Sequence, residues 1–270
     1  MTTAAIAAAL QQLKDFNSRD FTTAMTAALT HQVAQFSFPV ISPSAGGDGY
    51  DLCAVQRLTL SAGKNCGAVQ TTQVGYVPAG AFALAGHFPS LYNRIGASGQ
   101  APRADLPIAG LMGHVVVTQS AASALAINSG GLGGHIAVAA LDSLNIRPLA
   151  VWAQKQGKSV VIVPDNSDLS RASARDAARA TGAKVASPAY KPGQPNLLAA
   201  LSDAIHAAHE RLPIWNGRGD PADKLANASL RADAEKSAYT KLIIAPIAEA
   251  RPWTPVRASQ SISTGAEIGR

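Results

Sequence analysis

Between residues 113 and 212, short apolar runs alternate with helical patterns, and this alternation constrains the fold more than any other feature. The apolar runs predict strands, and the segments between them repeat apolar residues at helical spacing. Strands are expected at 115–118, 136–140, 160–164 and 184–186, with helices at 120–128, 147–157, 170–181 and 195–210. A helix that follows a strand is the usual crossover to a parallel neighbour. The pattern therefore predicts an α/β domain with a mostly parallel four-stranded sheet flanked by helices.

The rest of the chain has different sequence patterns. Two helical patterns, around Leu10 and Met25, predict a helical lead-in. They are followed by short β-like runs at 36–41, 52–60 and 69–77, separated by glycine-rich turns, which predict a small antiparallel sheet. We expect four segments: a helical lead-in (1–32), a β-rich region and connection (33–112), the α/β domain (113–212) and a basic, partly irregular extension (213–270).

Composition narrows the class of protein. A chain of 270 residues that is 47% hydrophobic can bury a full core, and it has no apolar run long enough to cross a bilayer. Cys53 and Cys66 have no CxxC partner and no histidine at zinc-finger spacing, so neither a structural zinc site nor a disulfide framework is expected. The first residues lack the pattern of a signal peptide, which predicts a cytoplasmic protein with no membrane partner. A net charge of +6 suits a polyanionic partner without requiring one.

Polar residues directly follow two of the predicted strands. Gln119 and Ser120 follow the run that begins at Val115, and the segment Asp165–Asp168 follows the run that begins at Val160. Open α/β sheets bind their ligands at the carboxyl ends of the strands. These residues are therefore the first candidates for a site.

The two strand ends resemble the metal-site motifs of Toprim domains, in the version found in plasmid and phage primases. In that family the first strand leads into a turn that carries a glutamate, and the third strand ends in an Asp-x-Asp pair. The resemblance runs from Val115 to Pro188 and includes the turn Asp142–Asn145 and the helix after Ser170. It implies a Toprim-like fold, preceded by a β-rich region as in those primases, and a nucleic-acid partner.

The family's carboxylates hold magnesium for phosphoryl transfer, and this set is incomplete here. Gln119 stands at the position of the family's glutamate, and an amide supplies neither a proton acceptor nor a charge. Asp165 matches the first aspartate, Ser167 stands at the second, and Asp168 follows one position later. We therefore assign no catalytic residue, keep Asp165 and Asp168 as metal candidates, and expect no cofactor or weakly bound Mg²⁺. The alternative is an ordinary loop in which Asp168 or Ser170 caps the next helix.

Basic residues surround this loop in the sequence. Arg171, Arg175 and Arg179 recur every four residues and line one face of the predicted helix, where they could contact a phosphate backbone. Lys155 and Lys158 lie on or near the preceding helix and would extend such a patch. The alternative is a solvated helix face that keeps the protein soluble.

Aromatic residues are interleaved with arginines in the C-terminal segment. Trp215 lies between Arg211 and Arg218, and Trp253 follows Arg251 closely. Such mixtures bind single-stranded nucleic acid through base stacking and charge. In the alternative interpretation, both tryptophans pack on the domain and anchor the tail.

These observations predict a primase-related, Toprim-like protein with impaired catalysis. It is expected to bind DNA, in single-stranded form, or to serve as an accessory factor, with replication or transfer proteins of a mobile element as further partners. Two alternatives stay open. The chain could be an active magnesium-dependent primase or nuclease that uses Asp165 and Asp168, or an assembly module that touches no nucleic acid.

Overall fold

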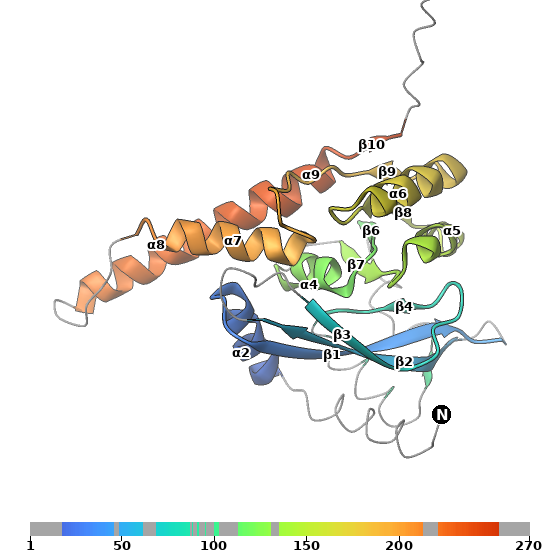
Figure 1. Cartoon of the computed structure of the whole chain (residues 1–270), viewed down its shortest axis with the longest axis horizontal. Helices are drawn as coiled ribbons and strands as arrows, with labels where there is room; N and C mark the ends of the chain where they lie inside the picture. The colour runs from blue at the N-terminus through green and yellow to red at the C-terminus, as the bar shows by residue number, and fades with distance from the viewer. Residues whose placement is uncertain are drawn as a thin grey trace, which may run out of the picture.

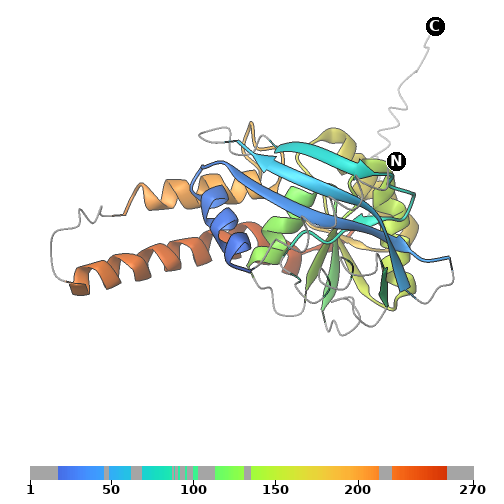
Figure 2. The same ribbon diagram turned by 90° about the horizontal axis from the view of Figure 1, so that it is seen from below.

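The structure is a computed structural model that describes residues 18–45, 49–61, 69–86, 88, 91, 95, 100–102, 113–130, 135–212 and 221–253. Across these residues the strands form one ten-stranded mixed sheet in the order β10-β9-β8-β6-β7-β4-β1-β2-β3, with β5 paired to β2. Helices pack against the sheet, and a pair of long helices extends away from it (Figures 1 and 2). The chain is therefore an α/β protein, as the sequence predicts.

The α/β segment contains the four predicted strands and the helices that follow them. The strands are β6 (His114–Thr118), β7 (Ile136–Ala139), β8 (Ser159–Val163) and β9 (Lys184–Val185), and neighbours among them pair in parallel. The helices are α4 (Ala121–Ser129), α5 (Ile146–Lys155), α6 (Asp168–Thr181) and α7 (Leu197–His209). Strands β6, β7 and β8 are buried along most of their length, which explains why their sequences are continuous apolar runs rather than alternating ones.

The β-rich region contains the predicted antiparallel sheet. Helix α2 (Ser18–Leu29) precedes β1 (Ala34–Pro43), β2 (Gly49–Leu60) and β3 (Val69–Gly75), with β5 (Gln100–Pro102) along β2. The helical pattern around Leu10 lies outside the described residues.

The predicted sheet of four strands is only one part of a larger sheet. Strand β4 (Phe82–Ala83) joins the two parts, because Ala83 pairs with Val40 of β1 on one side and with Ala139 of β7 on the other. The β-rich region therefore continues the sheet of the α/β segment and shares one hydrophobic core with it. The sequence left open whether the β-rich region is independent, and the structure shows the four parallel strands as one part of a larger mixed sheet. The Toprim assignment stays a prediction.

Aromatic side chains from both parts of the sheet meet at β4. Phe82 is fully buried, with its ring centroid 4.5 Å from that of Trp152 on α5 and 6.0 Å from that of Tyr50 on β2. Nearby, the Asn145 side-chain amide donates to the carbonyl of Ala81 at 2.6 Å, and its Oδ1 accepts from Gly80 at 2.7 Å. The turn after β7 is thereby tied to the segment that leads into β4.

The described part of the C-terminal extension contains two helices and a short strand. Helix α8 (Pro221–Tyr239) runs beside α7, and a π-helical turn η4 (Thr240–Ile244) leads into α9 (Ala245–Ala248). The chain then adds β10 (Arg251–Pro252) antiparallel to β9 at the end of the sheet (Figure 1). Sequence periodicity did not predict β10, which carries Arg251 and leads directly into Trp253. Among the described residues, no helix has both the length and the apolar character needed to span a bilayer.

Candidate functional site

The site lies at the carboxyl ends of β6 and β8, where the direction of the chain crossovers reverses. The chain leaves β6 toward β7 through α4, whereas it passes from β7 to β8 and β9, on the other side of β6, through α5 and α6. Helix α4 packs with α7 and α5 packs with α6, so the two pairs cover opposite faces of the sheet. Such a reversal leaves a crevice beyond the strand ends, which is where open α/β sheets bind ligands.

Asp165 follows β8 and is buried, with 8% of its surface exposed. Ser123 Oγ on α4 donates to Asp165 Oδ1 at 2.5 Å and accepts from the backbone N–H of Leu197 at 3.0 Å. The backbone N–H of Asp165 donates to Ser170 Oγ at 2.9 Å. Burial raises the pKa of the Asp165 carboxyl to about 6, because hydrogen bonds from Ser123 and Ser120 only partly offset the loss of hydration.

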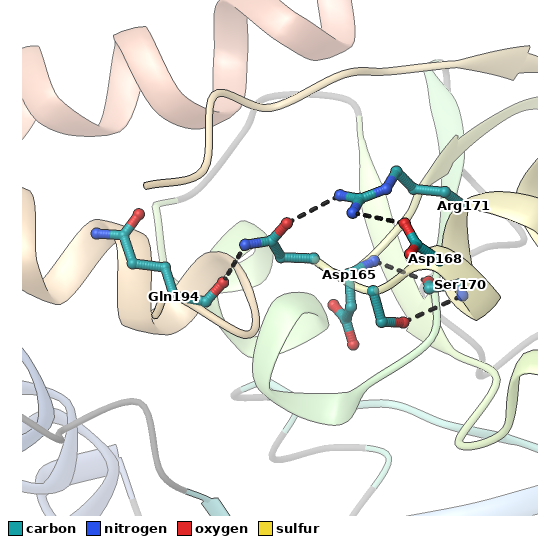
Figure 3. Close-up of polar contacts among 7 residues, drawn as sticks. Asp165, Asp168, Ser170, Arg171 and Gln194 are labelled. Atoms are coloured by element: carbon teal, nitrogen blue, oxygen red, sulfur yellow. Dashed lines mark hydrogen bonds and ion pairs between the residues drawn. The ribbon is translucent and has the colours of Figure 1, made fainter. Parts of the chain in front are cut away.

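The loop after Asp165 is held by the first turn of α6 and by the loop before α7 (Figure 3). Arg171 donates to Asn166 Oδ1 at 2.8 Å and to Asp168 Oδ1 at 3.2 Å, and Asn166 Nδ2 donates to the carbonyl of Gln194 at 2.7 Å. Ser167 caps α6 by accepting from the backbone N–H of Ser170. The capping interpretation of this loop is confirmed, but the cap is Ser167 rather than Asp168 or Ser170.

The candidate metal ligands do not form a magnesium site. Asp165 is buried and bonded to Ser123, whereas the Asp168 side chain is fully exposed and paired with Arg171. Gln119 is half-buried, its Oε1 has no hydrogen-bond partner within the described part of the chain, and it carries no charge. No group of three or more His, Cys, Asp or Glu side chains suited to a metal comes together among those residues. Mg²⁺ prefers several anionic oxygens, so these residues do not fit a magnesium ion.

A recess of about 400 Å³ opens beside Asp165. Its floor is buried and consists of Pro164 and Asp165, whereas its other lining residues are half-buried or exposed. The half-buried walls are Val185, Pro188, Tyr190 and Trp253, and the exposed rim is Arg171, Arg175, Ser187, Arg251 and Pro252. The recess thus has mostly apolar and aromatic walls and a cationic rim, and its size is within the range of small-molecule sites.

The arginines predicted on α6 lie at or near this recess. Arg171 and Arg175 line it, and the Arg179 guanidinium lies 4.6 Å from the ring centroid of Trp253 while pairing with Asp176. Arg175 and Arg251 form no ion pair within the described part of the chain. Two guanidinium groups at the rim are therefore free to bind an anion.

The other predicted basic and aromatic residues divide into three groups. Trp253 packs against the core, in line with the anchoring alternative, and it also lines the recess, while its stacking on bases stays a prediction. Lys155 ends α5 and Lys158 precedes β8, which places both at the amino end of β8, opposite to Asp165. Trp215 and Arg218 lie outside the described residues.

Tyr190 and Arg251 line the recess but were not among the predicted site residues. The Tyr190 hydroxyl donates to the carbonyl of Pro164 at 2.8 Å, and burial together with the nearby Asp165 charge holds its pKa well above the ordinary value. Open α/β sheets bind ligands at the carboxyl ends of their strands, and this tendency identified Asp165 after β8. Tyr190 follows β9, so the same tendency would also have identified Tyr190. Arg251 had no such signal, because its place depends on the pairing of β10 with β9.

We expect Ser123→Ala to lower the free energy of unfolding by about 1–2 kcal/mol, because it leaves the Leu197 N–H and Asp165 Oδ1 without their shared partner. Urea denaturation near neutral pH measures this loss. Ser129→Ala is a matched control on the same helix, since Ser129 is half-buried and donates only to the carbonyl of Ala126 within its own last turn. An equal effect of the two substitutions would contradict the structural role of Ser123.

Comparisons with known proteins found no match: no family model, no curated protein and no solved structure matches the chain. The function is therefore inferred from the residues of the site.

Proposed function

We propose that this protein binds single-stranded DNA, with backbone phosphates held at the arginine rim of the recess. The observation that carries the proposal is the convergence of Arg171 and Arg175 from α6 with Arg251 from β10 at the opening of one recess. These segments are far apart in the sequence, so the cluster does not follow from local helical spacing alone.

The chemistry of the rim suits a phosphodiester. A guanidinium group offers a planar fork of N–H donors that matches two phosphate oxygens, and it keeps its charge at every physiological pH. Among the described residues, Asp165 is the only carboxylic acid that lines the recess, and its carboxyl is bonded to Ser123 on α4 rather than to the arginines of the rim. The opening of the recess therefore attracts anions.

The walls favour a single strand over a duplex. Trp253 and Tyr190 offer aromatic surface, and unpaired bases bind proteins largely by stacking on such side chains. In a duplex the bases are already paired and stacked, so only the phosphates would be available. The resemblance to primase Toprim domains also favours a nucleic-acid partner, and the proposed role is binding in replication or transfer of a mobile element without phosphoryl-transfer chemistry.

The double substitution Arg175→Glu/Arg251→Glu is expected to weaken binding of a fluorescein-labelled oligo(dT) by tenfold or more, since each charge-assisted hydrogen bond that it removes is worth about 1.5–3 kcal/mol. Fluorescence anisotropy across a range of salt concentrations measures the affinity. The slope of log K against log salt should fall by about 0.7 for each phosphate that the variant no longer neutralises.

Arg231→Glu is the matched control. Arg231 is exposed on α8, which extends away from the sheet (Figure 2), and it does not line the recess. Arg231→Glu changes the net charge by the same amount per residue as the rim substitutions do. Because Arg231 does not line the recess, its substitution should alter the affinity far less than the double substitution. An equal loss in the control, or no salt-dependent binding by the unmodified protein, would refute the proposed function.

A further inference from the structure

The two ends of the sheet differ in how they are protected against pairing with a further strand. At one end, β10 consists of only Arg251 and Pro252, and a short strand with a charge and a proline is a poor template for pairing. At the other end, β3 has seven residues and contains neither a charged residue nor a proline. The backbone N–H and C=O groups on the outer side of such a strand are free to pair with another chain.

The outer side of β3 is open within the described part of the chain. β3 pairs with β2 along all seven of its residues without a register shift, and among the described residues it pairs with no second strand. The side chains of Gln70–Val74 are all exposed. At the end of the strand, the Gln73 side-chain amide donates to the Gly75 carbonyl at 3.1 Å. β3 is therefore a regular strand whose middle part has one free edge.

We propose that two copies of this protein pair through β3 in antiparallel orientation, so that one sheet continues through both copies. Closed dimers with a two-fold axis are the commonest soluble assemblies, and such an axis brings the same surface of both copies together. Residues that pair across antiparallel strands point to the same face of the sheet. The axis must therefore pass through a residue that faces its own copy, and Thr72 is the middle residue of β3.

The residue pairs that this axis creates are compatible with each other. Thr72 faces Thr72 of the second copy, Thr71 faces Gln73, and Gln70 faces Val74. All of these side chains are neutral, so no like charges meet, and pairs of β-branched or hydrogen-bonding side chains stabilise neighbouring strands. Val74 is 39% exposed in a single copy, and a strand beside it would cover part of this apolar surface. The edge is thus complementary to itself.

The order of β3 favours a second copy over a flexible peptide. A peptide that adds to a sheet edge loses conformational freedom, whereas β3 of the second copy is already an ordered strand. The paired segment is short, so the interface is smaller than that of a permanent dimer. Each copy also carries a net charge of +6, and salt screens the resulting repulsion. The dimer is therefore reversible, and it becomes stronger as the salt concentration rises.

Pairing through β3 leaves the arginine-rimmed recess open in both copies. β3 and the strands β9 and β10, which contribute to the recess, lie at opposite ends of the strand order (Figure 1). A dimer thus presents two recesses, one at each end of the continuous sheet. The pairing itself does not depend on the proposed function, but it would let one long strand contact both recesses and bind with higher avidity.

Sedimentation velocity of the full chain without DNA, at protein concentrations from about 1 μM to about 100 μM, tests the proposal. The mass is expected to rise from the 27.7 kDa of one copy toward the mass of two copies. At a fixed protein concentration the dimer fraction should increase with salt, which is opposite to the salt dependence of DNA binding. Thr71→Lys/Thr72→Lys should weaken the association by about tenfold or more, because a lysine then faces its own copy for an axis at either threonine.

Thr23→Lys/Ser237→Lys is the matched control. Both residues are exposed on helices, Thr23 on α2 and Ser237 on α8, and the substitutions add the same two charges away from β3. Circular dichroism verifies that both double variants keep the fold, and the control should associate about as strongly as the unmodified protein. The mass of a single copy at every concentration would overturn the proposal, as would an assembly larger than two copies. Unchanged association of Thr71→Lys/Thr72→Lys, or an equal loss in the control, would overturn it as well.

Discussion

Asp165→Asn is expected to stabilise the protein by roughly 2–3 kcal/mol near pH 8 and to change its stability little near pH 4. The pKa of this carboxyl is about 6 in the folded protein against an ordinary value of 3.8, and this difference corresponds to roughly 3 kcal/mol. The cause is burial, which disfavours the charged form at the end of β8. Asparagine has the shape of the neutral carboxyl and can still accept the hydrogen bond from Ser123.

The direction of the pH dependence follows from the raised pKa. Below about pH 4 the carboxyl is protonated in both the folded and the unfolded protein, so burial carries no ionisation cost. Between about pH 4 and pH 6 the unfolded protein releases this proton and the folded protein retains it, so the stability falls as pH rises. Above pH 6 both forms are ionised and the full cost is present. The stabilisation by asparagine should therefore grow across this interval and then become constant.

Urea denaturation of both proteins at several pH values from 4 to 8 measures the difference. Asp142→Asn is the control, because Asp142 is exposed after β7 and its substitution should not reproduce this profile. A difference between Asp165→Asn and the unmodified protein that is the same at all pH values would contradict the buried carboxylate. A lower stability of Asp165→Asn near pH 8 would contradict it as well.

A residue that costs stability at neutral pH is more readily explained by ligand binding than by folding. Stabilising substitutions in binding sites commonly reduce function, because such sites hold polar groups that bind a ligand but cost stability without it.

The parts of the fold that sequence could predict are those with local signals. The buried runs that begin at Val115 and Val160 are long enough to identify as strands, and the spacing of Arg171, Arg175 and Arg179 places them on one helix face. Asp165 then became a candidate because open α/β sheets bind ligands at the carboxyl ends of their strands. Each of these inferences uses only residues that are close together in the chain.

The parts that sequence could not predict depend on distant contacts. Strands β4 and β10 have two residues each, too few to show any periodicity, and they are defined by their partners Ala139 and Val185. The environment of Asp165 likewise depends on Ser123, which lies on a helix that begins after a different strand. The charged opening of the recess needs Arg251, which only the pairing of β10 with β9 brings there.

Phe82→Ala is expected to lower the free energy of unfolding by roughly 3–5 kcal/mol, the cost of removing a fully buried aromatic side chain. Phe82 lies in the short strand that connects the antiparallel and parallel parts of the sheet, and it contacts Tyr50 from one part and Trp152 from the other. Its removal therefore weakens both parts together. Far-ultraviolet circular dichroism and tryptophan fluorescence, followed in the same urea titration, should show one coincident transition at lower urea.

Tyr76→Ala is the matched control for the loss of an aromatic ring, because Tyr76 is 76% exposed and its removal opens no cavity. Its effect should stay within about 0.5 kcal/mol, as for most surface substitutions.

If Phe82→Ala instead separated the unfolding into two transitions, the β-rich region and the α/β segment would be independent units joined by β4. The shared core indicates the opposite, since the same hydrophobic cluster contains Phe36 of β1, Phe82 of β4 and Val116 of β6. With a shared core, the recess is expected to depend on the stability of the whole sheet. Its residues Val185 and Arg251 belong to β9 and β10, which are outer strands of that sheet.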